Sequence, residues 1–341
     1  MLIYLGCIQL LLVGRVYQAN FTETDSSFFR NDLLFLAFTA SAIVFWLTWG
    51  GYSVDAWRYL ARFDFSPFLF REEQIFWISG YLLNKVVPDP WPLKILSTVS
   101  VLILAGAYYN YFRNQENGEL TFAYILLLLT PGFYLLTGNA VRQGLSGSLE
   151  LFGAVFFLQQ RYWSWMVFAL IGFFVHQFGI IVFGAVLIAR FLKKNLVLVW
   201  FLSFIFSPVA DYFLGVFDYN LESILRYGSS SEGYFHWGKV VVSGLVSSFV
   251  VVSLLVRPSS SLDFRHLYIA LIVISNSVLL YEVPFERIFL FSDLVAPLAL
   301  AQIFASYRWS RARYFVMLIV VLSGSLLLWT NHSIVKALGY T

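Results

Sequence analysis

Long hydrophobic runs separated by short polar turns recur along almost the whole chain. A helix that crosses the hydrocarbon core of a membrane needs roughly 20 mostly apolar residues. Runs near that length lie at 1–17, 33–50, 93–112, 120–137, 143–160, 196–217, 239–256, 266–282, 286–306 and 314–330. They do not alternate in short segments, as the strands of a membrane β-barrel would. The pattern predicts an all-α, polytopic membrane protein with about 11 or 12 transmembrane helices, forming a single transmembrane domain over residues 1–341.

One stretch, 163–192, fits this pattern in two ways. It is too long for one upright helix and too short for two complete spans, and His176 lies near its middle. If two short helices meet near His176, their junction lies below the membrane surface, where broken structure is tolerated beside a wet cavity. If the stretch is one tilted span, more of the Lys and Arg residues fall on the cytoplasmic side, which the positive-inside rule favours. The residues alone leave both alternatives open.

Two polar stretches, 51–92 and 218–238, interrupt the hydrophobic runs. The first combines Trp57, Trp77 and Trp91 with several charged residues, a mixture typical of segments that lie at a membrane surface. We expect it to be an amphipathic, partly helical loop. In the two-helix interpretation of the preceding stretch, both loops are extracytoplasmic.

Composition narrows the class of protein further. Hydrophobic residues make up 60% of the 341 residues and charged residues only 12%, whereas about a quarter is usual in soluble domains. The single cysteine, Cys7, excludes a disulfide-stapled scaffold. A net charge of +3 is too small to indicate nucleic acid as a partner. The chain carries no motif with metal-ligand spacing and no Gly-rich phosphate loop, so we expect no metal and no cofactor.

Arg142 begins an apolar run beside Gln143. It is either an arginine that reaches to the membrane surface from a helix end, or a fixed cation that faces an anionic group. Arginine suits phosphate because its planar guanidinium donates two parallel, charge-assisted hydrogen bonds. Glu150 lies two turns further along and is interpreted as structural, paired with another polar group in the membrane.

The remaining candidates each have a structural alternative as well. His176 lies among aromatic residues and is either a satisfied buried group or a catalyst. Arg287 opens a span next to Glu286, which would neutralise it. The loop that holds Arg226 and Tyr234 is either a mobile cover over a site or a plain connection.

Four short segments, taken in order, resemble the EpsG-like family, the Wzy-type polymerases of bacterial O-antigens, capsules and exopolysaccharides. GYSVDAWRY at 51–59 is similar to the Gly-x-Asp-x-x-x-Tyr segment that follows the second span of these proteins, and Glu73 continues the match. NAVRQGL at 139–145 resembles their Arg-Gln helix start, FFVH at 173–176 their Phe-x-His element, and PFER at 284–287 their late arginine region.

The resemblance implies a GT-C-like helical fold and a glycosyltransferase that joins undecaprenyl-diphosphate-linked repeat units. It also implies a bacterial cytoplasmic membrane location with an active site facing the periplasm or the outside, and it favours the two-helix interpretation of 163–192. The implied partners are a lipid-linked oligosaccharide donor and acceptor and membrane lipid, with a chain-length regulator protein as a further candidate.

With that activity we predict three sets of site residues. Catalytic roles go to Asp55, Glu73 and His176; diphosphate binding goes to Arg142, Arg226 and Arg287; and substrate binding goes to Arg58, Tyr59, Gln143 and Tyr234. Asp55 or Glu73 would orient or deprotonate the acceptor hydroxyl, and the arginines would stabilise the leaving diphosphate.

Three other classes of protein compete with this prediction. A secondary transporter or flippase would place broken helices in two matching repeats, but only one interrupted segment is visible. A membrane acyltransferase would use a histidine as base toward a cytoplasmic acyl donor. Another lipid-sugar glycosyltransferase, such as a ligase or a mannosyltransferase, would share the fold and the donor.

Overall fold

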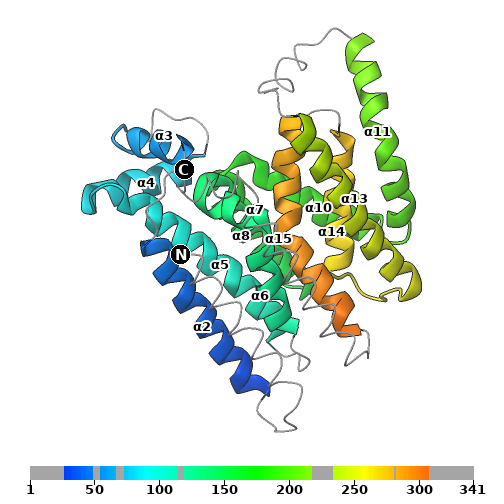
Figure 1. Cartoon of the computed structure of the whole chain (residues 1–341), viewed down its shortest axis with the longest axis horizontal. Helices are drawn as coiled ribbons and strands as arrows, with labels where there is room; N and C mark the ends of the chain where they lie inside the picture. Colours follow the sequence, from blue (N-terminus) through cyan, green and yellow to red (C-terminus); the bar gives the residue numbers. More distant parts are fainter. Residues whose placement is uncertain are drawn as a thin grey trace. The chain divides into compact units, whose positions relative to one another are not determined.

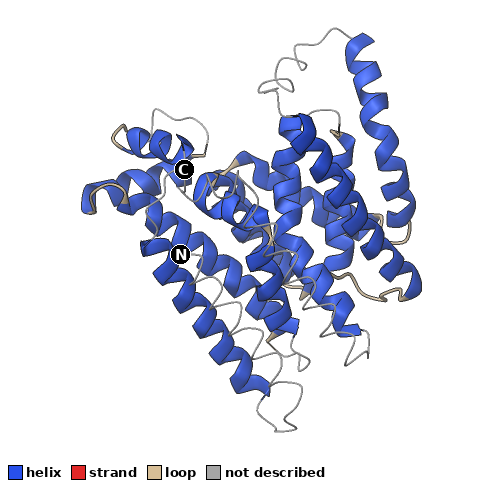
Figure 2. Cartoon of the chain, in the orientation of Figure 1, coloured by secondary structure: helices blue, strands red, loops and turns tan. Residues whose placement is uncertain are grey.

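The computed structural model describes residues 27–48, 54–66, 73–113, 119–216, 233–279 and 282–306. Within these ranges every secondary-structure element is helical, as Figures 1 and 2 show. The helices are α2 (Ser27–Thr48), α3 (Val54–Phe63), α4 (Gln74–Val86), α5 (Trp91–Phe112), α6 (Glu119–Leu129), α7 (Pro131–Tyr134), the π-helix η2 (Leu135–Asn139), α8 (Val141–Leu158), α9 (Tyr162–Val175), the 3-10 helix η3 (Gln177–Gly179), α10 (Ile180–Phe191), α11 (Leu196–Val216), α13 (Gly233–Val256), α14 (Phe264–Ser277) and α15 (Glu282–Ser306).

The chain divides into two compact units, residues 1–180 with 304–341 and residues 181–303. In the first unit α5 packs against α2 and α8, and α8 packs against α9. Helix α2 runs beside α5 along most of its length (Figure 1). In the second unit α14 packs against α11 and α13. The prediction of one domain over the whole chain stays a prediction.

Hydropathy and helix length confirm the predicted class, an all-α polytopic membrane protein. Two described helices, Trp91–Phe112 and Arg287–Phe304, are long and apolar enough to cross a membrane, and a bent pair formed by Glu119–Leu129 and Gly132–Gly138 makes up a third candidate. Shorter apolar helices add to these at Asn31–Leu47, Tyr162–Val175, Gln177–Phe191, Leu196–Phe206 and Val240–Val256. The predicted runs 1–17 and 314–330 lie outside the described residues, so the total of about 11 or 12 spans stays a prediction.

Two predicted spans are interrupted. The run at 120–137 bends by 75° between α6 and α7, because Pro131 disfavours helical geometry at the residue before it and has no N–H to bond the preceding turn. The stretch at 163–192 forms two helices: α9 ends at Val175, His176 is extended (φ −158°, ψ 124°), and α10 begins at Ile180 after the 3-10 turn. The break at His176 therefore follows the two-helix interpretation of the sequence.

The predicted amphipathic loop at 51–92 contains α3 and α4, so it is partly helical as expected. Helix α4 buries Phe76, Trp77 and Gly80, whereas Leu82 is 57% exposed. Exposed apolar residues beside charged ones suit a membrane surface. Of the second predicted loop, 218–238, residues 218–232 lie outside the described residues, and residues 233–238 belong to helix α13 rather than to a loop.

Candidate functional site

An aromatic core holds α3 and α4 against α5 and α8 and forms the base of the site. Tyr59, Phe63, Phe76 and Trp77 are all less than 8% exposed. Most of their rings meet edge to face, as those of Tyr59 and Phe76 do with centroids 5.4 Å apart. Gly80 permits this packing, because a Cβ there would lie 2.0 Å from Cε1 of Phe63. The core therefore fixes the start of α4, where Glu73 lies.

Glu73 is the N-cap of α4 and has a left-handed backbone (φ 59°, ψ 37°). Its carbonyl accepts from the N–H groups of Phe76 (3.1 Å) and Trp77 (3.3 Å). A non-glycine residue in this region costs about 1–3 kcal/mol and is concentrated at functional sites. The conformation directs the Glu73 side chain away from the usual capping position, and it makes no cap hydrogen bond to α4.

Arg142 lies in the first turn of α8, directly after the π-helix. Its Nη1 donates to Oε2 of Glu73. The guanidinium also lies over two aromatic rings, 5.2 Å from the Tyr59 centroid and 5.3 Å from the Trp77 centroid. Cation–π contacts of this kind are worth about 0.5–2 kcal/mol each. Arg142 is thus fixed by residues of α3 and α4 that are distant in the sequence.

His176 occupies the break after α9 and is 6% exposed. Its backbone N–H donates to Gly172 O (2.9 Å), and its carbonyl accepts from Gly179 N (2.8 Å) and Ser146 Oγ (3.3 Å). Nδ1 of the ring contacts Oε1 of Glu73. Glu73 therefore uses one carboxylate oxygen for Arg142 and the other for His176.

The electrostatics of this cluster fix the histidine tautomer. Burial disfavours the charged form of Glu73, but the hydrogen bonds and charges of His176 and Arg142 outweigh it, so the pKa of Glu73 lies below its ordinary value of 4.5. An ionised carboxylate only accepts hydrogen bonds, so Nδ1 of His176 carries the proton toward Glu73. In the neutral ring, Nε2 is then the basic nitrogen.

The cluster also has unused capacity for an anion. The Arg142 side chain is 25% exposed, and its buried Nε has no hydrogen-bond partner among the described residues. Helix α8 begins at Val141 with no side-chain cap, and the first N–H groups of a helix attract negative charge. An anion beside Arg142 would interact favourably with both the guanidinium and the start of α8. The same carboxylate that holds Arg142 also holds His176, through Nδ1.

Comparison with known proteins identifies the family. The model of the EpsG family matches residues 32–341, a range that includes Glu73, Arg142 and His176. The chain belongs to the EpsG family. No curated protein and no solved structure matches it. Membership in the EpsG family supports a polysaccharide polymerase-like function of glycosyltransferase type, a multi-pass membrane protein, and in general terms a lipid-linked sugar substrate.

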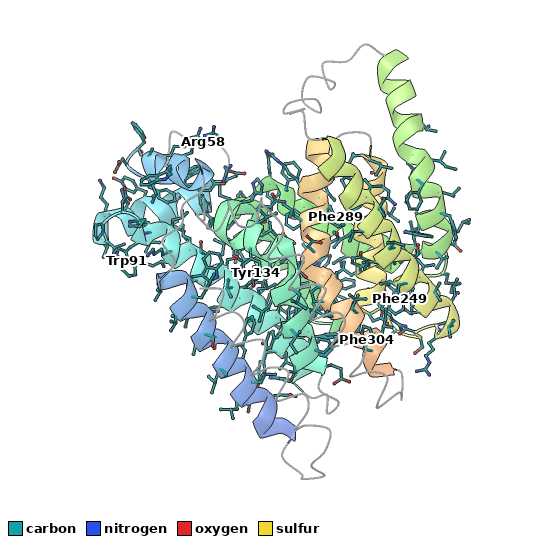
Figure 3. All side chains as sticks on the ribbon, viewed as in Figure 1. Arg58, Trp91, Tyr134, Phe249, Phe289 and Phe304 are labelled. Carbon is teal, nitrogen blue, oxygen red and sulfur yellow. The ribbon has the colours of Figure 1, made fainter. Side chains whose placement is uncertain are left out.

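The structure of this EpsG-family protein brings together three of the predicted site residues, Glu73, Arg142 and His176. Tyr59 lies against the Arg142 guanidinium and is 7% exposed. Gln143 is 5% exposed, and Arg58 is exposed on α3 (Figure 3). The roles of these residues in substrate binding stay predictions.

The structure does not show the other four predicted site residues in contact with this cluster. Arg226 lies outside the described residues, and the side chains of Asp55 in α3 and Tyr234 in α13 are not described. Arg287 belongs to the second unit, where it is exposed on α15. Their predicted catalytic, diphosphate-binding and substrate-binding roles stay predictions.

Sequence reasoning missed three residues that support the site: Trp77, Ser146 and Gly172. Trp77 was recognised only as a surface aromatic, although it lies one turn after Glu73 and stacks on Arg142. Ser146 lies one turn after Arg142, and this spacing places both on one face of α8. Ser146 Oγ donates to Gly172 O (2.9 Å), so that face contacts the end of α9.

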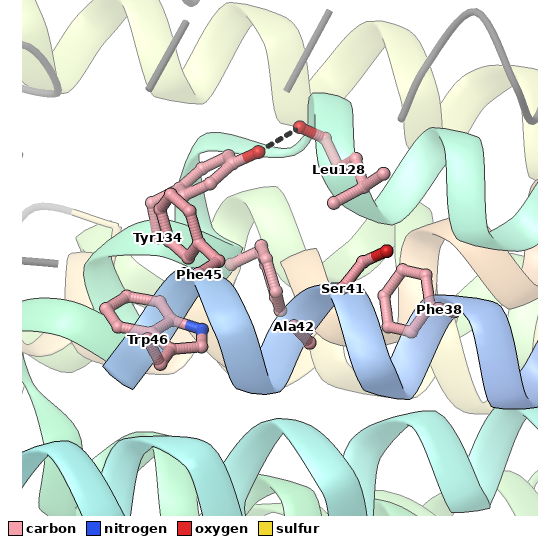
Figure 4. A pocket seen from close by; sticks show the side chains of 8 residues that line it. Phe38, Ser41, Ala42, Phe45, Trp46, Leu128 and Tyr134 are labelled. Carbon is pink, nitrogen blue, oxygen red and sulfur yellow. Dashed lines mark hydrogen bonds between the residues drawn. The ribbon is translucent and has the colours of Figure 1, made fainter. Parts of the chain in front are cut away.

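The described residues contain two further features outside the Glu73–Arg142–His176 cluster. An apolar recess is lined by Phe38, Ser41, Ala42, Phe45, Trp46, Leu128, Phe133 and Tyr134, and Figure 4 shows the Tyr134 hydroxyl donating to Leu128 O (2.9 Å). In the second unit Asp263 caps α14 and pairs with Arg265 and His266, both at 2.7 Å. In the described part of the chain, no group of three His, Cys, Asp or Glu side chains is placed to hold a metal ion.

Proposed function

We propose that this protein is a polymerase that joins undecaprenyl-diphosphate-linked oligosaccharide repeat units into a surface polysaccharide. The reaction takes place at the periplasmic or outer face of the bacterial cytoplasmic membrane. The observation that carries the proposal is the three-residue cluster, in which one carboxylate holds a partly exposed arginine and a histidine within a chain that belongs to the EpsG family.

In the proposed step, the hydroxyl oxygen of the acceptor attacks the anomeric carbon of the donor. The bond from that carbon to the diphosphate oxygen breaks, and the leaving lipid diphosphate takes the electron pair. Arg142 and the N-terminus of α8 stabilise the negative charge that develops on the leaving oxygens. Nε2 of His176 takes the hydroxyl proton.

Glu73 has an orienting role in this mechanism rather than the role of base. Its pKa is lowered, and a weak base is a poor acceptor for the proton of a sugar hydroxyl. Both of its oxygens are also engaged, one by Arg142 and one by His176. Glu73 thus keeps the proton of His176 on Nδ1 and leaves Nε2 for the substrate, as the carboxylate of a Ser-His-Asp triad does.

The test is polymer formation by purified protein in lipid nanodiscs, supplied with lipid-linked repeat units. Arg142→Ala removes a charge-stabilising donor and is expected to lower the rate about a hundredfold to a thousandfold. Arg62→Ala is the matched control, because Arg62 lies over the same Trp77 ring at 5.8 Å but is exposed on α3 and makes no ion pair with Glu73.

The result also separates the competing classes of protein. Wild-type chain lengths from Arg142→Ala protein would refute the mechanism. Single transfers to an acceptor other than a lipid-linked repeat unit would identify a ligase or a mannosyltransferase. Intact polymer with lost transport of the lipid-linked unit would identify a carrier.

A further inference from the structure

Glu150 is a buried acid that the proposed mechanism does not use. It lies in α8, is 1% exposed, and neither carboxyl oxygen has a hydrogen-bond partner among the described residues. The sequence interpretation, in which Glu150 pairs with another polar group in the membrane, is therefore not supported. An ionised carboxylate in such a place would lack any compensation for its lost hydration, so the group is neutral in this conformation.

Glu150 shares one face of α8 with the site. Arg142, Ser146 and Glu150 follow each other at intervals of four residues, and this interval places side chains on the same side of a helix. Arg142 contacts Glu73, and Ser146 donates to Gly172 O and His176 O. Glu150 is the next member of this row, one turn deeper in α8.

The carboxyl group of Glu150 fills a notch formed by two glycines that flank His176. A Cβ on Gly172 would lie 2.6 Å from Oε1 of Glu150, and a Cβ on Gly179 would lie 3.0 Å from the same atom. Both approaches are closer than ordinary van der Waals contact. Glycine at both positions thus lets the last turn of α9 and the end of the 3-10 turn close around the carboxyl group.

The same two glycines hold the backbone of His176. Gly172 O accepts from His176 N at 2.9 Å, and Gly179 N donates to His176 O at 2.8 Å. The position of the imidazole relative to Glu73 therefore depends on the spacing of Gly172 and Gly179. Glu150 occupies the space between α8 and those residues.

We infer that Glu150 is a positioning residue: its neutral carboxyl group fills the Gly172–Gly179 notch and thereby holds His176 at Glu73. It contacts neither Glu73 nor Arg142 by hydrogen bond or ion pair among the described residues. The effect of Glu150 on the reaction rate rests on the proposed function of His176. The placement and the protonation of Glu150 do not depend on that function.

The first experiment measures the protonation of Glu150 by infrared difference spectroscopy of the full-length protein in lipid nanodiscs. The spectrum of wild-type protein minus that of Glu150→Gln is expected to contain the carbonyl band of a protonated carboxyl group at neutral pH. Carboxylate bands in its place would overturn the inference, because an ionised Glu150 needs a partner that the notch does not supply.

The second experiment measures the effect on His176 by ¹⁵N NMR of histidine-labelled protein, with the His176 signals assigned from a His176→Gln variant. Glu150→Ala empties the notch and is expected to shift both ring nitrogen signals of His176, whereas Glu150→Gln keeps the shape and neutrality and restores them. Glu150→Met serves in place of the alanine variant if the latter does not fold. Unshifted His176 signals in the alanine or methionine variant would overturn the inference.

Controls and activity complete the test. Glu119→Ala removes another buried glutamate, 5% exposed in α6, and is expected to leave the His176 signals unchanged. An equal shift of the His176 signals in this variant would show a general loss of packing and overturn the specific role of Glu150.

In the polymerisation assay, Glu150→Ala is expected to lower kcat about tenfold with a small change in KM, and Glu150→Gln is expected to recover most of the lost kcat. Spectroscopic results as expected, but no polymerase activity in any variant or in wild type, would reject the proposed function alone.

Discussion

Replacing Glu73 by glutamine probes the arrangement at the centre of the site. The carboxylate offers two equivalent oxygens, one to Nη1 of Arg142 and the other to Nδ1 of His176. Glutamine has nearly the same shape but only one oxygen. Arg142 is permanently charged and only donates hydrogen bonds, so it takes that oxygen. The amide NH₂ then faces Nδ1 of His176.

An NH₂ group that faces Nδ1 reverses the tautomer. Nδ1 must now accept a hydrogen bond, so the ring proton moves to Nε2 and the basic nitrogen no longer faces the substrate. The equivalent change in a Ser-His-Asp triad lowers kcat about ten-thousandfold. Some catalysis by Arg142 and the α8 N-terminus remains, so we expect a loss of about a hundredfold to ten-thousandfold, or about 3–5 kcal/mol in the activation barrier.

The assay is the initial rate of polymerisation by purified protein, with the ¹⁵N signals of His176 recorded on the same samples. Asp64→Asn is the matched control, because Asp64 is an acid between α3 and α4 that accepts from Asn84 Nδ2 (2.8 Å) in an exposed position. A Glu73→Gln rate within about threefold of wild type, or His176 signals that keep the proton on Nδ1, would refute the reasoning.

Three further predictions test the charges and the packing around the site. Because the pKa of Glu73 is lowered in the folded protein, its stabilising effect is fully present above the ordinary value of 4.5 and is lost as the pH falls from there through the lowered value. The Tm difference between wild type and Glu73→Gln, followed by thermal unfolding from neutral to acid pH, should therefore stay constant above pH 4.5 and shrink below it. A difference that grows on acidification would be contrary to the assignment. Gly80→Ala places a Cβ 2.0 Å from Cε1 of the buried Phe63 and should destabilise the protein by about 1–3 kcal/mol. The control, Gly184→Ala, has nothing within 4 Å of its added Cβ and should be neutral or stabilising by up to about 1 kcal/mol. Equal unfolding temperatures for the two variants would contradict the packing at Gly80. Trp77→Leu removes one of the two rings beneath Arg142 and should lower kcat/KM about threefold to thirtyfold, and an unchanged value would show that the stacking does not position the guanidinium.

The helical class and several candidate residues follow from the sequence because they depend on local features. Apolar runs of membrane-spanning length predict helices wherever they occur. The polar pair His176-Gln177 inside an apolar run indicated a possible break, and the structure has α9 end at Val175. Pro131 is a local signal of the same kind, and it explains the bend after α6.

The arrangement of the site depends on contacts that no local pattern reveals. Glu73 has a left-handed backbone, although glutamate has no preference for this conformation. The residue that joins Arg142 to His176 is separated from them by 69 and 103 positions. The sequence predicts a polar partner for Glu150, but Gly172 and Gly179 closely approach its carboxyl group, and no hydrogen-bond partner is found among the described residues.

The central claim is that Glu73 and His176 act as one catalytic unit beside Arg142. The most direct measurement compares the polymerisation rates of Glu73→Gln, His176→Ala and the double variant. Residues that act as a unit are strongly non-additive, so the double variant should be no slower than His176→Ala alone. Losses that multiply in the double variant would show that the two residues act independently, and the proposed role of Glu73 would be wrong.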